Sequence, residues 1–444
     1  MRNWIVLFWG IFLLGCGAKL SPPQEPQIQG ELHAHHAWWR GYGDENLEDF
    51  LELVLKHNSE VNIARVTLLS ALARADLMDD DLYPSPDASM GLHHSKNLNQ
   101  GSSTRTFSHK FGLNYELDIY GKIMDAAGAE AFRARASAFD LQSLRLSIIN
   151  RALNHIFELA YLNDAKNLLD ERAANLEELV GLYALKYELG RAEELELLHA
   201  KQSLLQARQN LLSNAQNRDL VLKNLKDLAG GAEDFSRLAY FEEVGLENFK
   251  ILRPDFNISL QNLALRPDVR ASLARLKAAF KDHSAVQKSL LPNLSLGGLL
   301  SGTAAELKDS FRLEILSGNV ALSLPFLDYA KLRQNIKISQ LSYEALRHAY
   351  ERDLQGAMNE FALVFKDYES DVRALENSSL SVLEQERIAE AYFEKYELGK
   401  SELSDYLEAE RALNASKIEL LKAKFKLFKT INSYYQITTL AADE

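Results

Sequence analysis

The sequence is poor in cysteine, proline and glycine. Its 444 residues include one Cys, 9 Pro and 22 Gly, whereas Leu, Ala, Glu and Lys are abundant. The single cysteine, Cys16, has no partner in the chain, so a disulfide framework is excluded. Because proline and glycine are the residues that interrupt helices, their scarcity favours long helices. Apolar residues make up 47% of the chain and charged residues 25%, which indicates a folded rather than a disordered protein.

Positive charge is also in short supply. The chain carries 50 Lys and Arg against 62 Asp and Glu, a formal net charge of −12. Nucleic-acid phosphates are bound by clustered cationic side chains, and the sequence contains no such cluster, so we expect no nucleic-acid partner. It also lacks a P-loop, a Gly-rich dinucleotide fingerprint and a Ser/His/Asp arrangement, and we expect no enzyme activity.

A pronounced apolar run lies at the N-terminus. Arg2 precedes an apolar stretch over 4–14, with small residues at its end. A basic start, a short apolar run and small residues together are the pattern of a secretory signal. The run is shorter than the roughly 20 residues that cross a bilayer as a helix. We therefore predict a signal peptide at 1–15.

Cys16 lies where a bacterial lipoprotein signal places its lipidated cysteine. The segment Leu13-Leu14-Gly15-Cys16 resembles a lipobox, in which that cysteine becomes the first mature residue. An ordinary signal followed by a chance cysteine is the alternative. Gly17 is not the Asp that usually retains lipoproteins at the inner membrane. We therefore expect a lipid-anchored protein of the cell outer membrane with a large periplasmic part, and no cofactor besides the covalent lipid on Cys16.

The rest of the chain contains two copies of one plan. Short segments recur in the same order at offsets of 208 or 209 residues, and matched positions are Val61 and Val269, Pro84 and Pro292, Tyr120 and Tyr329, and Tyr187 and Tyr396. A nearly constant offset predicts an internal structural repeat. We place the first repeat at 47–230 and the second at 263–434. A lipidated N-terminal linker at 16–46, an inter-repeat segment at 231–262 and a tail at 435–444 complete the chain.

Each repeat is expected to begin with a helix and to continue with two strands. The helices are predicted at 47–78 and 266–290, and a proline follows each. Apolar and polar residues then alternate, as between Phe111 and Ile119, which is typical of strands. The predicted strands are 88–93, 107–119, 293–300 and 311–324. A half-buried soluble sheet and a membrane barrel would both show this alternation.

A long helical hairpin is expected to end each repeat. Segments 122–187 and 331–396 contain no proline, and at 66 residues each a continuous helix would be about 100 Å long. Apolar residues recur at spacings of three and four, which indicates coiled-coil-like packing, with an ordinary helical bundle as the alternative. Turns and returning helices follow at 187–191, 192–229, 396–401 and 401–434.

Several motifs carry a resemblance to a known family. In chain order they are Glu116-Leu117-Asp118-Ile119-Tyr120-Gly121-Lys122, Leu265-Arg266-Pro267-Asp268-Val269, Leu291-Pro292-Asn293-Leu294-Ser295-Leu296, and Tyr396-x-x-Gly399-x-Ser401 followed by Leu407-Glu408-Ala409-Glu410-Arg411. Their order and spacing resemble the outer-membrane efflux (TolC-like) family, in particular its lipidated branch. Tyr120 stands where many members have Trp, and residues 429–435 replace a Gly-rich segment.

The resemblance implies a mainly α-helical homotrimer with a small β part. In the family, the long hairpins of three chains form a trimeric α-barrel, and four strands per chain contribute to a shared 12-stranded outer-membrane β-barrel. The strand count agrees, since a barrel made by one chain needs at least about eight strands. The implied function is a passive exit duct for drugs or other small toxic compounds. Its implied partners are outer-membrane lipid, a periplasmic adaptor and an inner-membrane pump of the resistance-nodulation-division type.

The resemblance also assigns residues by position. Asp405 and Glu408 match the periplasmic gate of the family and lie about one helical turn apart. Three copies would hold six carboxylates, a ring that favours cations. A solvated helix face is the alternative interpretation of Asp405. The adaptor-contact tip would comprise Tyr187, Gly190, Arg191, Tyr396, Gly399 and Lys400.

Other classes of protein remain open at this stage. A structural coiled-coil outer-membrane lipoprotein would explain the helices but not the matching strands. A duct could also serve type I protein secretion or metal-cation export. His33, His35 and His36 offer imidazole ligands for a transition metal or a metal enzyme. Because they lie in the polar linker, a solvated segment is the better interpretation, and we predict no metal site.

Overall fold

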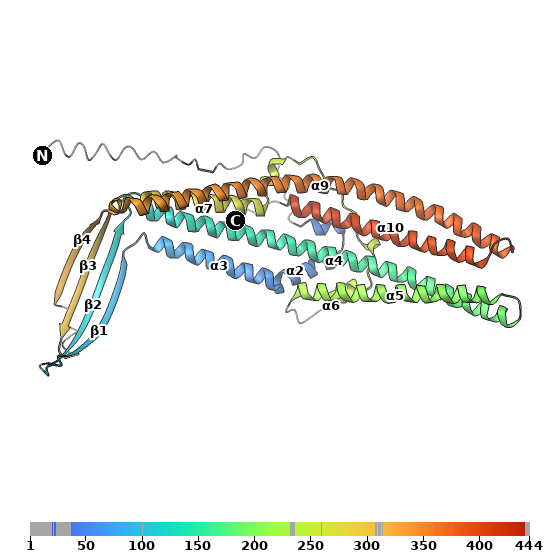
Figure 1. Ribbon diagram of the computed structural model, residues 1–444, viewed down its shortest axis with the longest axis horizontal. Coiled ribbons are helices and arrows are strands. Elements are labelled where there is room, and N and C mark those ends of the chain that lie inside the picture. The colour runs from blue at the N-terminus through green and yellow to red at the C-terminus, as the bar shows by residue number, and fades with distance from the viewer. Residues whose placement is uncertain are drawn as a thin grey trace. The chain divides into compact units, whose positions relative to one another are not determined.

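The computed structural model shows a mainly helical chain with one four-stranded sheet (Figure 1). Cys16, His33, His35 and His36 lie outside the residues that the structure describes. No helix within the described ranges is both long and apolar enough to cross a membrane. The described residues are 20, 22, 23, 37–99, 101–230, 236–258, 260–306, 309, 312 and 314–439.

The first of two compact units contains the sheet. This unit comprises Met1–Pro26, Thr67–Ala138 and Arg270–Asp353. The strands are antiparallel in the order β1-β2-β3-β4, and β2 pairs with β3, which joins the two repeats. Their bounds are β1 Ser85–Lys96, β2 Ser103–Leu117, β3 Asn293–Ala304 and β4 Ile315–Ser323.

The strand boundaries differ from those predicted, although four strands form where four were expected. β1 and β3 are longer than the predicted 88–93 and 293–300, because polar residues beyond the alternating pattern still pair in the ladder. β2 ends at Leu117 rather than at 119. There the chain turns, and the N–H of Gly121, which has φ +69°, donates to the carbonyl of Asp118 (3.2 Å).

Helices α3 (Ser59–Asp80), α4 (Lys122–Glu188), α7 (Pro267–Lys288) and α9 (Tyr329–Glu397) contribute to the first unit. The Asp118 carboxylate accepts hydrogen bonds from the N–H groups of Ile123 (3.1 Å) and Met124 (2.8 Å) at the start of α4. Such a side-chain acceptor satisfies N–H groups that have no partner within the helix. The Glu-Leu-Asp motif is therefore a strand end followed by a helix cap.

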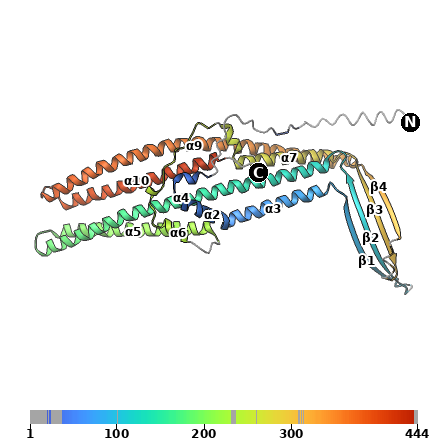
Figure 2. The same ribbon diagram turned by 180° about the vertical axis from the view of Figure 1, so that it is seen from behind.

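The second unit comprises Gln27–Val66, Phe139–Val269 and Leu354–Glu444 and contains both helical hairpins. In Figures 1 and 2, α5 runs beside α4 and α10 runs beside α9. α4 and α9 are unbroken over 67 and 69 residues, as the absence of proline predicts. The further elements are η2 Trp38–Tyr42, α2 Glu45–His57, α5 Glu194–Ala229, α6 Ser236–Phe241, η3 Leu246–Asn248, η4 Leu260–Leu265, η5 Pro325–Asp328 and α10 Leu403–Thr438.

The helix predicted at 47–78 is two helices, because Asn58 interrupts it. Its backbone is extended, and its side chain accepts from the N–H of Val61 (3.1 Å) at the start of α3. The Asn58 amide also donates to the carbonyl of Leu228 (2.9 Å) at the end of α5. The break therefore joins α2 and α3 to the end of the first hairpin.

Both ends of the chain's predicted folded region extend further than expected. Trp38 and Tyr42, placed in the linker 16–46, are buried, and both donate to the side-chain oxygen of Asn432 (3.2 and 2.8 Å). Tyr435 and Ile437, placed in the tail 435–444, are buried in the last turns of α10. These residues form one core with Phe157, whose ring centroid lies 4.9 Å from that of Tyr42.

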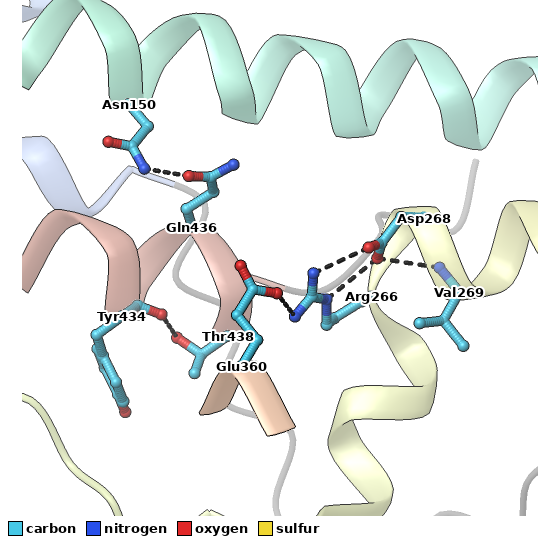
Figure 3. A network of polar contacts seen from close by, with 8 residues as sticks. All are labelled: Asn150, Arg266, Asp268, Val269, Glu360, Tyr434, Gln436 and Thr438. Atoms are coloured by element: carbon cyan, nitrogen blue, oxygen red, sulfur yellow. Dashed lines mark hydrogen bonds and ion pairs between the residues drawn. The ribbon is translucent and has the colours of Figure 1, made fainter. Parts of the chain in front are cut away.

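The Arg-Pro-Asp motif fixes the start of α7 (Figure 3). Arg266 is 9% exposed, and its guanidinium donates to the carboxylates of Asp268 (2.9 Å) and Glu360 (2.8 Å). Asp268 also accepts from the N–H of Val269 (3.0 Å). Pro267 occupies the first helical position, where its missing N–H costs no helical hydrogen bond. The motif thus connects the start of α7 to α9.

Candidate functional site

The first hairpin turns at Gly190, where φ is +66°. The N–H of Gly190 donates to the carbonyl of Tyr187 (2.9 Å), and the N–H of Arg191 donates to that of Lys186 (2.7 Å). These two bonds form a Schellman motif, which ends a helix with one left-handed residue. Glycine adopts that conformation without the steric cost that a Cβ atom brings.

The second hairpin repeats this turn 209 residues later. Gly399 has the same φ of +66°, and its N–H donates to the carbonyl of Tyr396 (3.0 Å). The N–H of Lys400 donates to the carbonyl of Lys395 (2.8 Å). The structure therefore places turns at both predicted tips, with one geometry.

Each returning helix begins with a capping box. The N–H of Glu193 donates to the Glu196 carboxylate (3.0 Å) at the start of α5. At the start of α10 the N–H of Glu402 donates in the same way to Asp405 (3.3 Å). Reciprocal bonds of this kind satisfy N–H groups that the first helical turn leaves without partners. Asp405 thus has a structural role that the sequence assignment did not include.

The two hairpins meet near their turns through aromatic and cationic side chains. Tyr183 of α4 is buried, and its hydroxyl is hydrogen-bonded to that of Tyr396 of α9. The Lys186 ammonium donates to the Tyr396 hydroxyl (3.3 Å) and lies 4.9 Å from the centre of the Tyr183 ring. Burial, with the hydrogen bond to Tyr396, raises the pKa of Tyr183, so both hydroxyls stay neutral at physiological pH.

An apolar cluster lies beside this contact, and we call it the tip cluster. It combines residues of α4, α5 and α10, which ties both hairpins into one core near the turns. Buried apolar area of this kind is the main source of helix-to-helix stability. Its buried members are Ala173, Leu176, Tyr183, Leu197, Ala200, Leu204, Ala207, Leu403 and Leu407.

The predicted tip residues do not share one environment. Tyr187, Gly190, Arg191, Gly399 and Lys400 are exposed and available to a partner. Their matched counterpart Tyr396 is half-buried, because its ring stacks on Tyr406 (6.0 Å between centroids) and its hydroxyl contacts Tyr183. Equivalent positions in the two repeats thus differ in function: one tyrosine is exposed and the other connects the hairpins.

The predicted gate residues lie on the exposed side of α10. Asp405 and Glu408 are both exposed, and the Glu408 carboxylate accepts from Arg411 (2.6 Å). Glu408 is therefore paired along its own helix, whereas Asp405 caps it. Within the described residues, no three His, Cys, Asp or Glu side chains are placed to hold a metal ion.

Two charged residues near the gate were not predicted. Arg172 of α4 is 8% exposed, and Glu410 of α10 is half-buried. The sequence did contain a signal for Glu410, because it lies seven residues after Leu403 and three after Leu407. That spacing places it on the inward face of an amphipathic helix.

Comparison with known proteins agrees with this geometry. The outer membrane efflux protein family matches residues 50–231 and 259–438. Toxin and drug export protein A of Aggregatibacter actinomycetemcomitans is 28% identical over 93% of this chain and 90% of its own length. The cation efflux system protein CusC of Escherichia coli strain K12 is 21% identical over 92% of this chain and 89% of its own.

The fold recurs among solved structures. The Campylobacter jejuni CmeC outer membrane channel superposes with a TM-score of 0.83 at 23% identity, and the alignment covers 95% of this chain and 94% of that one. Because the family match spans both repeats, including both hairpin turns and most of the four strands, the chain belongs to the outer membrane efflux protein family.

Proposed function

We propose that this chain is the outer-membrane exit duct of a tripartite efflux system, assembled from three copies. The observation that carries the proposal is the four-stranded sheet with its two outer strands. β1 and β4 each pair with a single neighbour within the described part of the chain, and all of their residues are exposed. Unpaired strand edges seek partners, and four strands from each of three copies supply a 12-stranded barrel.

The lipid anchor on Cys16 is part of the proposal. Leu20, four residues later, packs against the buried cluster of Leu276, Ala279 and Tyr343 in the first unit. Four extended residues span at most about 14 Å. A lipid on Cys16 would thus be held close to the unit that carries the strands, which suits a membrane anchor.

The hairpin tips are proposed to receive the periplasmic adaptor. Tyr187, Arg191 and Lys400 are exposed beside rigid turns, and a rigid turn presents its side chains with little loss of conformational entropy. Asp405 and Glu408 would line the closed entrance as a ring of six carboxylates, which favours cations. The energy source would be an inner-membrane pump of the resistance-nodulation-division type.

The favoured cargo is a drug or other small toxic compound. The relative from Aggregatibacter is named for toxin and drug export, and CusC is named for cation efflux. An acidic entrance is compatible with organic cations and with metal cations. A strain lacking this chain should therefore be tested with one compound of each class, and restored resistance to the organic cation alone would support drug export over metal export.

Mass measurement and negative-stain imaging of the detergent-extracted, lipidated protein test the assembly. We expect three chains per particle and a three-fold tapered tube. A monomer, or a bundle without a channel, would favour the structural coiled-coil lipoprotein instead. Type I protein secretion would be favoured if the trimer forms but supports export of a protein and of neither small compound.

A further inference from the structure

Arg172 is a buried cation next to the tip cluster. Its side chain lies on α4, one residue before Ala173 of that cluster, and the residue is 8% exposed. Its Nε atom has no hydrogen-bond partner among the described residues. A charged group removed from water is strongly disfavoured unless an opposite charge compensates it. The packing therefore requires an anion near Arg172.

The arrangement of the helices identifies that anion. α4 approaches its turn while α10 leaves its own, and Leu176 of α4 shares the tip cluster with Leu407 of α10. Residues before Leu176 on α4 therefore lie level with residues after Leu407 on α10. Arg172 is four positions before Leu176, and Glu410 is three positions after Leu407. The Glu410 side chain is half-buried on this inward face.

The charges near Arg172 agree with this assignment. Burial lowers the pKa of the Arg172 guanidinium, and the charge of Glu410 opposes that effect more than the charge of Glu408 does. Conversely, burial raises the pKa of the Glu410 carboxyl, and Arg172 opposes that rise. Arg411 also acts on Arg172, by repulsion, but it is bound to Glu408 (2.6 Å) on the exposed side of α10. Glu410 is thus the carboxylate that faces Arg172.

We propose that Arg172 is a positioning residue for the gate: its charge pairing with Glu410 holds the first turns of α10 against α4. Those turns carry Asp405 and Glu408, so the inference rests on the proposed function for its consequence in the channel. The start of α10 can leave α4 only by separating two charges that the tip cluster shields from water. Shielded charges interact more strongly than exposed ones, so this pairing favours the closed arrangement.

The test compares Arg172→Met and Glu410→Gln in the full-length, lipidated protein. Methionine keeps the length and apolar stem of arginine without its charge. We expect amide hydrogen exchange over 403–411 to become at least tenfold faster in both variants, and resting bilayer conductance to rise severalfold. Arg411→Met is the matched control, because its partner Glu408 is exposed, and it should change the exchange rate less than twofold.

A charge reversal separates pairing from general packing. The double variant Arg172→Glu with Glu410→Arg should restore slow exchange over 403–411, whereas each reversal alone should not. Should Arg172→Met fail to fold, Arg172→Lys keeps the charge and should retain slow exchange. Unchanged exchange in both single variants, or no recovery in the double reversal, would overturn the pairing. Faster exchange with unchanged conductance would leave the pairing intact and instead remove the gate from the proposed function.

Discussion

Gly190 and Gly399 show how a single residue type determines the turn of a hairpin. Both have φ of +66°, and no atom lies within 4 Å of a Cβ added to either. Any cost of a side chain there comes from the backbone conformation alone, because there is no steric contact to relieve. The left-handed region costs an L-residue about 1–2 kcal/mol.

We therefore expect Gly190→Ala and Gly399→Ala each to destabilise the second unit by about 1–2 kcal/mol. The measurement is the thermal unfolding midpoint of the detergent-solubilised protein. Gly181→Ala is the matched control, since Gly181 also has open space around it but lies inside α4. Alanine there should stabilise the helix by about 0.5–1 kcal/mol. Equal shifts in the same direction at all three positions would contradict the argument.

Glu408 offers a cleaner test of the gate than Asp405 does. Asp405 accepts the capping hydrogen bond from Glu402, so its replacement would also weaken the start of α10. The Glu408–Arg411 pair is exposed, and its loss should change stability by less than about 0.5 kcal/mol. Glu408→Ala should nevertheless increase the resting conductance in a planar bilayer, because one ring of carboxylates is removed from the entrance.

The control for Glu408→Ala is Glu384→Ala on α9. Glu384 also forms an exposed pair with an arginine three residues later, Arg387 (3.3 Å). It is not among the residues assigned to the gate, so the conductance should stay at the wild-type value. An equal increase in both variants would mean that the effect is general electrostatics and not the gate.

At the scale of elements, the start of α4 is held to α7 by a buried carboxylate. Asp125 is 4% exposed and accepts hydrogen bonds from Lys281 (2.8 Å) and Ser284 (2.5 Å), and it also pairs with Lys288. Burial raises the pKa of Asp125, but the three donors together outweigh burial, and the net pKa is below the usual 3.8. The ionised carboxylate is therefore the form that the folded state prefers.

This sign predicts a specific pH dependence. A carboxyl whose pKa is lowered by folding adds stability above its unfolded pKa of 3.8, and that stability is lost as the pH falls through the lower folded value. Asp125→Asn should cost about 3–5 kcal/mol near neutral pH, because two lysines lose their anion. The cost should be constant above about pH 5 and should shrink below pH 4. Unfolding midpoints of wild type and variant across pH 3–7 measure it, and a constant difference throughout would contradict the assignment.

At the scale of the whole molecule, the anchor and the assembly can be separated. Cys16 is the only sulfur that could carry the lipid through a thioether, since the chain has no other cysteine. Cys16→Ser should abolish labelling by radioactive palmitate, because serine lacks the thiol. Each buried methylene of an acyl chain contributes about 0.8 kcal/mol to membrane binding. The unlipidated chain should thus be found in smaller amounts in the outer-membrane fraction.

A complementary comparison uses a lipidated variant whose strand edge is blocked. Proline lacks the N–H that a neighbouring strand would need, so Ser317→Pro on β4 should reduce the number of chains that assemble while leaving palmitate labelling intact. Normal trimers in this variant would contradict assembly through the strand edges. Retained palmitate in Cys16→Ser would contradict the lipid assignment independently.

The sequence alone determined the features that depend on neighbouring residues. The 209-residue offset between Tyr187 and Tyr396 predicted two equal tips, and the structure has the same turn at both. The absence of proline predicted two long unbroken helices, and they are present. A left-handed turn and an uninterrupted helix are set by local conformational preference, which a short segment of sequence specifies.

Only the tertiary structure decided the contacts between distant parts of the chain. Trp38 meets Asn432 across 394 positions, and neither residue belongs to a pattern that indicates the other. Residues 38–46 and 435–439 were therefore expected to lie outside the fold, although they help to form its core. The same holds for Arg172 and Glu410: each is one charge on its own helix, and only the packing of α4 against α10 removes water from both. Burial depends on all neighbours at once, and local periodicity indicates which face is covered without indicating by what.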